Sequence, residues 1–324
     1  MTGIGVVVIG RNEGERLRQC LQALAPGASP VVYVDSGSTD GSATMAESLG
    51  AIVVALDMSR PFTAARARNE GFARLLADHP TVVYVQFLDG DCELAPEWLA
   101  TASGFLDAQP TFAVACGRRR ERHPGYSIYN RLCDIEWDTP VGEARACGGD
   151  ALMRVEALRQ VGGFDARMIA GEEPELCVRL RQASWRIQRL DAEMTLHDAA
   201  MTRFGQWWKR QIRAGFAYSL GASMHGQPPE RHWVRERRRI IVWGFLYPAI
   251  LLALAWPTWG LSLLGLLIYP VQVLRIARKM HGRPWKDRLA FGTACMASKF
   301  PEFIGWCKFQ RARRRGPMRI IEYK

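Results

Sequence analysis

Two carboxylates stand two residues apart in Asp89-Gly90-Asp91, directly after the apolar run Val82–Leu88. Carboxylate oxygens in this spacing suit Mg²⁺ or Mn²⁺. A cation held there can neutralise a diphosphate and stabilise it as a leaving group. Asp-Gly pairs are also common in solvated turns, and the motif taken alone favours a turn. The cation site therefore depends on what other segments bring to it.

Over the first 90 residues, apolar runs of strand length alternate with helical patterns. The runs are Ile4–Ile9, Val31–Val34, Ala51–Ala55 and Val82–Leu88. This alternation predicts βαβ units around a mainly parallel sheet, with Asn12 capping the first helix. The acidic loops Asp35–Asp40 and Asp89–Asp91 both follow strand ends. We therefore expect them at one edge of the sheet, where ligands bind in such folds.

Charge is distributed unevenly along the 324 residues. Residues 1–200 hold 20 Lys/Arg and 27 Asp/Glu, whereas residues 201–324 hold 23 Lys/Arg and 5 Asp/Glu, for a total of +11. A nucleic-acid-binding protein usually carries its basic face on its folded module, so this pattern argues against a nucleic-acid partner. An acidic front with a basic tail is typical of an enzyme domain tethered to an anionic surface.

The eight cysteines show no spacing typical of a zinc site. We interpret them as buried free thiols in a reducing compartment, because a chain of this length needs no disulfides to fold. The N-terminal residues lack a basic segment and a cleavage site, so we expect them to begin a domain rather than a signal peptide.

Residues 240–274 contain no charged side chain. One straight helix of that length would measure about 52 Å, longer than a hydrocarbon core of about 30 Å. Pro257-Thr258 divides the run into halves of about 26 Å each, which predicts a transmembrane or re-entrant hairpin. Basic residues flank both ends, which favours cytosolic ends. The alternative is a helical hairpin buried in a soluble core.

These patterns predict four regions. They are a catalytic domain over 1–215, a basic amphipathic linker helix over 216–239, the hairpin over 240–274, and a basic cytosolic or interfacial tail over 275–324. Within the tail, the stretch Leu289–Phe309 is interrupted by charge and proline, which favours an interfacial helix. The Arg-rich cluster at 311–315 suits anionic headgroups.

Several segments, in order, resemble the family 2 glycosyltransferases, inverting enzymes with the GT-A fold, over roughly residues 4–215. They are Val7–Glu13, Val34–Gly41, Ala65–Gly71, Phe87–Asp91, Gly148–Arg154 with Val161–Asp165, and Gly171–Leu176 with Arg179. The resemblance implies an α/β, Rossmann-like, mainly parallel sheet flanked by helices. To this we add C-terminal membrane-associated helices.

The resemblance also implies roles for individual residues. It assigns nucleotide binding to Asn12, Asp35, Ser36, Arg68 and Asp89. It assigns Mn²⁺ or Mg²⁺ to Asp91, Asp89 and His197, and the acceptor side to Gly148, Gly149, Asp150, Arg210 and Arg213. Two of these residues have plain structural alternatives: His197 as a capping or core histidine, and Arg68 as a solvated helix residue. Ser36 departs from the family, where many members carry a second Asp, which leaves the nucleotide base open with UDP as the default.

Inverting transfer needs a carboxylate that removes a proton from the acceptor hydroxyl. By resemblance this base is Glu173, although the family usually has Asp there, and Glu172 is the rival. An acidic helix N-terminus favoured by the helix dipole is the structural alternative. Gln206–Arg210 resembles, but does not match, an element of processive synthases, so a polymerase is not expected.

The sequence thus predicts a membrane-associated transferase. It would move a sugar from a nucleotide diphosphate sugar to a lipid-linked, polyprenyl-carried acceptor, at the cytoplasmic membrane and facing the cytosol. One alternative is a polyprenyl-phosphate glycosyl synthase, whose ionised acceptor needs no base. Others are a sugar-1-phosphate nucleotidyltransferase, for which the loop Gly10–Gly14 is too short and acidic, and a non-catalytic membrane scaffold.

Overall fold

The computed structural model describes residues 3–24 and 30–315, which divide into two compact units. The first unit comprises residues up to Arg122 and Glu136–Ala199; the second comprises His123–Ile135 and the described residues from Ala200 onward. The domain boundary predicted at residue 215 falls inside one continuous helix, α8 (Phe204–His225). The last nine residues of the predicted tail lie outside the described residues.

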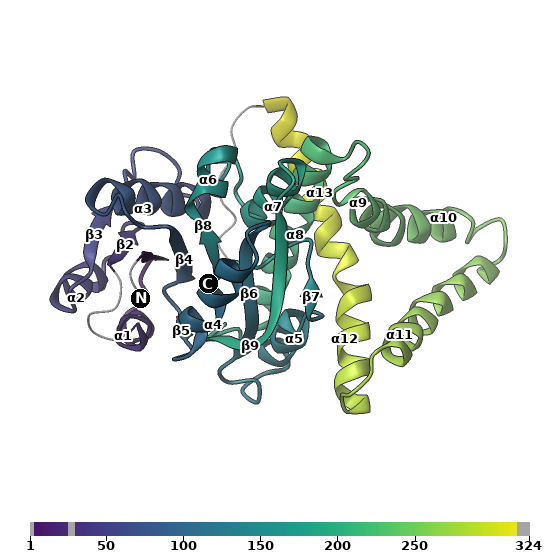
Figure 1. Ribbon diagram of the computed structural model, residues 1–324. Helices are drawn as coiled ribbons and strands as arrows, with labels where there is room; N and C mark the ends of the chain where they lie inside the picture. Colours follow the sequence, from purple (N-terminus) through teal and green to yellow (C-terminus); the bar gives the residue numbers. More distant parts are fainter. Residues whose placement is uncertain (1–2, 25–29, 316–324) are drawn as a thin grey trace. The chain divides into compact units, whose positions relative to one another are not determined.

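A mixed sheet organises the first unit (Figure 1). Its strands are β1 (Ile4–Gly10), β2 (Val31–Asp35), β3 (Ile52–Ala55), β4 (Tyr84–Asp89), β5 (Cys92–Leu94), β6 (Phe112–Glu121), β7 (Gly142–Glu143), β8 (Ala151–Arg154) and β9 (Arg186–His197). The strand order is β3-β2-β1-β4-β8-β6-β9-β5, with β7 paired to β9. The predicted parallel strands β1 to β4 are confirmed, whereas β8 runs antiparallel to both β4 and β6.

Helices pack against this sheet. They are α1 (Glu15–Ala23), α2 (Ser42–Ser48), α3 (Ala64–Asp78), α4 (Trp98–Ala108), α6 (Val155–Val161) and α7 (Glu172–Gln182). The α3 helix packs on β1 and β2, and α4 packs on β6 and β9. The α3 helix begins at a Thr63 cap, whose hydroxyl accepts the Arg66 N–H. This cap sets the start of the helix that carries Arg68.

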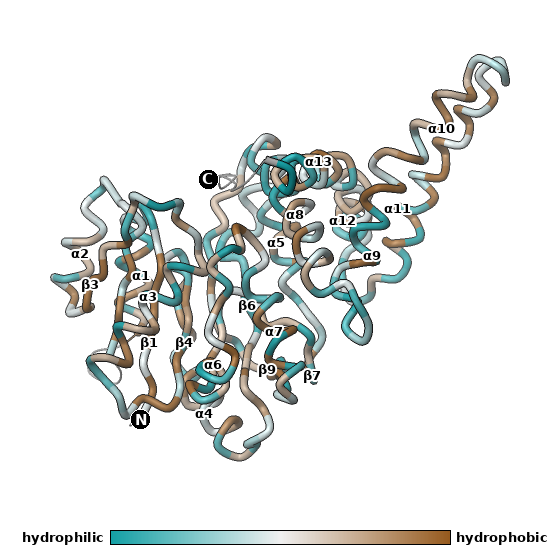
Figure 2. The backbone as a smooth tube through the Cα atoms, turned by 90° about the horizontal axis from the view of Figure 1, so that it is seen from above, coloured by the Kyte–Doolittle hydropathy of each residue, from teal (hydrophilic) through white to brown (hydrophobic). Residues whose placement is uncertain are grey.

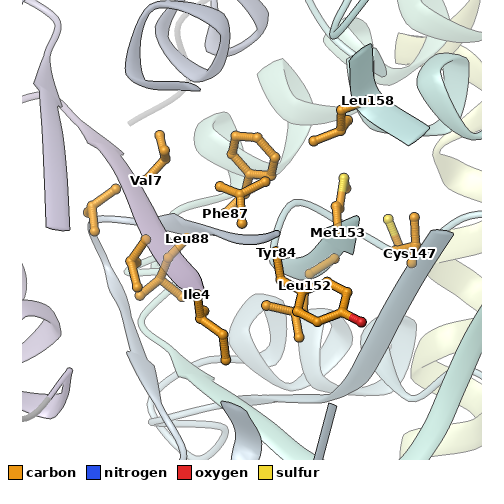
Figure 3. Close-up of a cluster of buried hydrophobic side chains, with 14 of the residues drawn as sticks. Ile4, Val7, Tyr84, Phe87, Leu88, Cys147, Leu152, Met153 and Leu158 are labelled. Atoms are coloured by element: carbon orange, nitrogen blue, oxygen red, sulfur yellow. The ribbon is translucent and has the colours of Figure 1, made fainter. Parts of the chain in front are cut away.

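The core lies between the sheet and its helices. Figure 3 shows Val7, Phe87 and Leu152 among the buried side chains that join β1, β4 and β8. Every residue of β1 from Ile4 to Ile9 is buried, as expected for a central strand covered on both faces. Because these strands are buried and paired along their length, their carboxyl ends lie in register. Gly10 lies opposite Asp35, and Ile9 lies opposite Asp89.

The described part of the second unit is helical. It contains α5 (Ile128–Trp137, whose last two residues belong to the first unit), α8, α9 (Val234–Ile241), α10 (Tyr247–Ala253), α11 (Ile268–Lys279), α12 (Trp285–Ala297) and α13 (Lys299–Arg315). A π-helical turn covers Val242–Leu246, and a 3₁₀ segment covers Leu261–Leu267. The predicted stretch 289–309 therefore forms parts of two helices.

Close helix packing explains why α8 does not end at residue 215. A Cβ on Gly215 would lie 2.0 Å from the carbonyl oxygen of Glu302, and one on Gly305 would lie 2.1 Å from that of Ile212. Glycines on both helices thus let the backbones of α8 and α13 approach closely. This packing lies at the predicted boundary itself, where α8 continues without a break.

The uncharged run forms a helical hairpin, with its two arms side by side and brown in Figure 2. Ser262 Oγ donates to the carbonyl of Leu251, and Tyr247 Oη donates to that of Gly265, so the arms are hydrogen-bonded to each other. The chain turns over residues 254–260, around Pro257-Thr258. Among the described residues, one helix, Leu261–Lys279, has the length and hydropathy of a membrane span.

Candidate functional site

Asp89, Asp91 and His197 meet at one edge of the sheet. Asp89 ends β4, and His197 ends β9, where it pairs with Cys92 of β5. His197 Nε2 lies 3.3 Å from Asp91 Oδ1, and ligand atoms of Asp89, Asp91, Cys92 and His197 all lie within 4.8 Å of one another. Two carboxylates and an imidazole form a donor set that suits Mn²⁺. These residues therefore fit the cation that the sequence predicts.

Arg68 links this group to the acidic helix. Its Nη2 donates to Asp89 Oδ1 at 2.7 Å, and its Nη1 donates to Glu172 Oε1 at 2.6 Å. Burial disfavours the charged guanidinium, but the two carboxylates outweigh burial and raise the pKa of Arg68. Arg68 is thus a buried, charged bridge between β4 and α7, not a solvated residue of a helix surface.

The side chain of Asp150 holds the backbone of Asp89 in place. The fully buried carboxylate accepts the Asp89 backbone N–H at 3.1 Å and the Thr195 hydroxyl at 3.0 Å, and Arg119 Nη2 lies 2.7 Å from its Oδ2. Burial raises the pKa of Asp150, while Arg119 lowers it in part. Asp150 thus fixes the position of Asp89 next to the cation group, and its role on the acceptor side stays a prediction.

The two glycines before Asp150 leave room for these charged side chains to contact one another. A Cβ on Gly149 would lie 3.0 Å from both Arg68 Nη2 and Asp89 Oδ2, and 3.2 Å from Arg119 Nη2. Gly148 has a φ of +83°, which disfavours other residues. Gly149 therefore lies against the donor-side charges, and any larger residue there would displace them.

The predicted nucleotide loop is held by its own side chains. Asp35 Oδ2 accepts the N–H groups of Gly37 and Ser38, and Ser36 donates its N–H to the carbonyl of Gly10. Asn12 Oδ1 accepts the Thr39 N–H at 2.8 Å. The prediction that Asn12 caps the first helix is wrong. The helix begins at Glu15 after Gly14, because the Asn12 side chain is used to join the two loops.

The two candidate bases have different surroundings. Glu172 is ion-paired with Arg68, whereas Glu173 is 94% buried and contacts Cys147 and Cys177. Burial raises the pKa of Glu173, and Glu172 adds to this, against hydrogen bonds that lower it. Glu173 is thus the acid whose pKa is raised and whose carboxylate, among the described residues, is not engaged by a cation, which favours it as the proton acceptor.

The remaining predicted residues, Arg210 and Arg213, lie on α8 in the other compact unit. Sequence reasoning missed Arg119 and Trp137. The Arg119 guanidinium lies 5.6 Å from the centre of the Trp137 ring, which meets His197 edge-on at 4.5 Å. One signal was available: Arg119 continues an apolar strand, and a buried charge in a strand needs an acidic partner.

Comparison with known proteins agrees with this geometry. Residues 5–162 match the family described as Glycosyl transferase family 2. This match assigns that part of the chain to the family. It is 28% identical over 296 residues to the pre-mycofactocin glycosyltransferase of Mycobacterium tuberculosis, covering 86% of this chain and 58% of that protein. It is 29% identical over 199 residues to the succinoglycan biosynthesis protein ExoA of Rhizobium meliloti, covering 57% of this chain and 60% of that protein. The matches thus span about three fifths of these relatives.

Solved structures show the same GT-A fold. The mannosyltransferase PcManGT of Pyrobaculum calidifontis, solved with GDP-Man and Mn²⁺, superposes with a TM-score of 0.62 at 19% identity, covering 94% of this chain and 87% of that one. Glucosyl-3-phosphoglycerate synthase of M. tuberculosis, solved with Mn²⁺, UDP-glucose and phosphoglyceric acid, gives a TM-score of 0.52 at 18% identity, covering 70% and 80%. These neighbours bind Mn²⁺ together with a nucleotide sugar.

Proposed function

We propose that this chain is a metal-dependent inverting glycosyltransferase. It transfers a sugar from a nucleotide diphosphate sugar, with UDP as the default nucleotide, to a lipid-linked saccharide at the membrane. The observation that carries the proposal is the grouping of His197, Asp91 and Asp89, with Arg68 joining Asp89 to Glu172 at the start of α7. The proposed proton acceptor Glu173 is the next residue of that helix.

The donor half of the site would bind the negatively charged diphosphate. Mn²⁺ or Mg²⁺ held by Asp89, Asp91 and His197 would neutralise the diphosphate. Arg68, charged and buried beside Asp89, adds a fixed positive group at the same edge. The backbone N–H groups around Asp35 shape the neighbouring loop, where the nucleotide base is expected.

The acceptor half of the site would remove one proton from the acceptor hydroxyl. In our proposal Glu173 takes the proton from the acceptor hydroxyl as its oxygen forms a bond to the anomeric carbon. The bond from that carbon to the diphosphate oxygen breaks at the same time, and the nucleoside diphosphate leaves from the opposite face. Glu172 remains paired with Arg68, so the two acids have separate roles.

The hairpin supports a membrane location. Trp256 and Trp259 are 93% and 96% exposed, and leucines project along both arms. Basic side chains flank the run, from Arg235 to Arg239 before it and from Arg275 to Lys279 after it. Exposed apolar arms between basic ends suit a bilayer with anionic headgroups. We propose the cytoplasmic membrane, with the first unit on the cytosolic side, where a polyprenyl-linked acceptor would lie.

A donor panel tests the chemistry. Purified protein is incubated with UDP-, GDP- and dTDP-sugars, Mn²⁺ and a membrane lipid extract, and nucleoside diphosphate release is measured. We expect turnover of at least one sugar nucleotide and its near-complete loss in Glu173→Gln, with donor binding intact. Near-normal turnover in Glu173→Gln would favour an ionised phosphate acceptor. The absence of turnover with every donor would contradict the proposal.

Membrane attachment is tested by fractionation without detergent. We expect the protein to stay with membranes in 1 M salt. At that concentration the Debye length is about 3 Å, so attraction between surface charges is screened, whereas apolar insertion remains. Release by salt alone would contradict an inserted hairpin.

A further inference from the structure

Two thiols and a backbone amide converge on one oxygen of Glu173. Its Oε1 accepts the Cys147 N–H at 2.5 Å, the Cys147 thiol at 3.1 Å and the Cys177 thiol at 3.0 Å. The two sulfur atoms lie 3.7 Å apart, and all three residues are buried. We call Cys147 and Cys177 the thiol pair.

The thiol pair comes from two distant segments. Cys177 lies four residues after Glu173 on α7, so the two side chains share a helix face. Cys147 directly precedes Gly148 and Gly149, in the segment that leads into β8, and Figure 3 shows it at the edge of the hydrophobic core. The pair therefore ties α7 to the segment that also borders Asp89.

We propose that Cys147 and Cys177 are positioning residues, which hold Oε1 of Glu173 so that Oε2 receives the proton of the acceptor hydroxyl. This inference rests on the proposed function. It also accounts for the departure from the family, which usually has Asp at this position. The additional methylene of Glu lets the carboxylate reach the amide and thiols, whereas an Asp on the same backbone would stop short of them.

The thiols remain protonated, as donors must be. Burial, together with Cys177 and Glu173, raises the pKa of the Cys147 thiol. For Cys177 the hydrogen bond with Cys147 lowers the pKa, but burial and Glu173 outweigh it. Apart from the pair, the titratable groups that face Glu173 are Glu172 on α7 and Cys116 on β6, and no cation is hydrogen-bonded to its carboxylate in the described residues. The pair and the Cys147 amide are thus its hydrogen-bond donors.

The test compares Cys147→Ala, Cys177→Ala and the two serine variants in the full-length protein. Turnover is measured with the sugar nucleotide that the donor panel selects, as a function of pH. We expect each alanine variant to lose roughly threefold to tenfold in kcat with donor KM unchanged. The acidic limb should move up by about half a pH unit to one unit, because the carboxylate loses a donor that favours its charged form.

Serine keeps a donor in a similar volume, so the serine variants should recover most of the loss. Cys116→Ala is the matched control: its thiol is also buried and faces Glu173, but it donates to the carbonyl of Gln188 and not to the carboxylate, so this variant should keep wild-type kcat and pH profile. If an alanine variant does not fold, Glu173→Asp carries the test with the serine variants: it should lose kcat, and Cys177→Ser added to it should cost nothing further, because the shorter side chain no longer reaches the thiols.

The outcomes separate this inference from the proposed function. Alanine variants with wild-type kcat and pH profile, beside an inactive Glu173→Gln, would overturn the role of the thiol pair and leave the base in place. Active Glu173→Gln would remove the base itself. Equal losses in serine, alanine and Cys116→Ala variants, with no change in the pH profile, would reduce the thiols to packing and also overturn the inference.

Discussion

The two compact units differ in which side chains they bury and which they expose. The first unit buries charge: Asp91, Asp150 and Arg68 are nearly inaccessible and Arg119 is largely covered, and each lies close to an opposite or hydrogen-bonding partner. The hairpin of the second unit exposes apolar side chains and contains no charge over 240–274. Burying a charge costs several kcal/mol unless it is paired, and exposing apolar surface costs about 25 cal/mol per Å² in water.

This contrast shows where each unit gains from its surroundings. The charged cluster keeps its geometry because internal partners replace water, so it is organised before any ligand arrives. The apolar side chains of the hairpin have few partners within the protein, so they are stabilised only when another apolar phase covers them. Changes in the first region should alter chemistry and stability, and changes in the second should alter location alone.

The largest effect should follow from Asp91→Ala. Loss of one ligand from the cation group should lower turnover about a thousandfold, equal to about 4 kcal/mol of activation free energy. Nucleoside diphosphate release with Mn²⁺ measures it. The control is Asp191→Ala, an exposed acid on β9, which should stay active. Comparable activity in both variants would remove the cation group from the mechanism.

Arg119→Met should have the next largest effect, because it leaves Asp150 buried without its cation. The expected loss of stability is about 3–5 kcal/mol, measured as a lower thermal unfolding midpoint. Arg120→Met is the matched control on the same strand, since its ion pair with Glu193 is about half exposed and is worth about 0–1 kcal/mol. Equal midpoints for the two variants would contradict the contrast between the regions.

Leu264→Lys should act on location without affecting the first unit. A lysine in the apolar hairpin should cost about 2.5–3.5 kcal/mol of insertion free energy. We expect less protein to float with liposomes that contain anionic lipid, and unchanged donor hydrolysis. Val141→Lys, at an exposed position of the first unit, should float like the wild type. Flotation that is equal in both variants would argue against the hairpin as the anchor.

The smallest effect is a displaced pH profile. The pKa of Glu173 is raised in the folded protein, so the base stays protonated to a higher pH than an exposed glutamate. Activity should therefore fall, as pH decreases, at a pH above the ordinary Glu range near 4.3. A profile of kcat/KM against pH measures this. An acidic limb at or below the ordinary value would contradict the burial of the working carboxylate.

The parallel half of the sheet could be predicted from the sequence. Strands β1, β2 and β4 are mainly apolar because both of their faces are buried, so the pattern is strong. The edge strand β3 is only partly buried but is also an apolar run. The strands after β4 could not be predicted in the same way. β5, β7 and β8 are short, and β6 ends in Arg118, Arg119 and Arg120, whose charges hide its strand pattern.

The site divides along similar lines. Asp89 and Asp91 were predicted from a motif that follows a strand, and His197 from the resemblance to the family; the structure brings the three together. The supporting role of Asp150 and the bridge made by Arg68 were not predictable, and for Arg119 the sequence indicated that an acidic partner was needed but not which one. Each depends on a partner 21 to 104 residues away in the chain, and spacing carries no information about such contacts.

The sequence by itself determined the family, the parallel strand pattern and the uncharged run, because these depend on local order and hydrophobic periodicity. The tertiary structure decided which carboxylate is paired with a cation and which is held by thiols. Neighbouring residues of one helix, Glu172 and Glu173, point to different surroundings. Burial raises the pKa of Glu173, and both its thiol donor Cys147 and the Arg68 partner of Glu172 come from distant segments, which only the folded chain brings together.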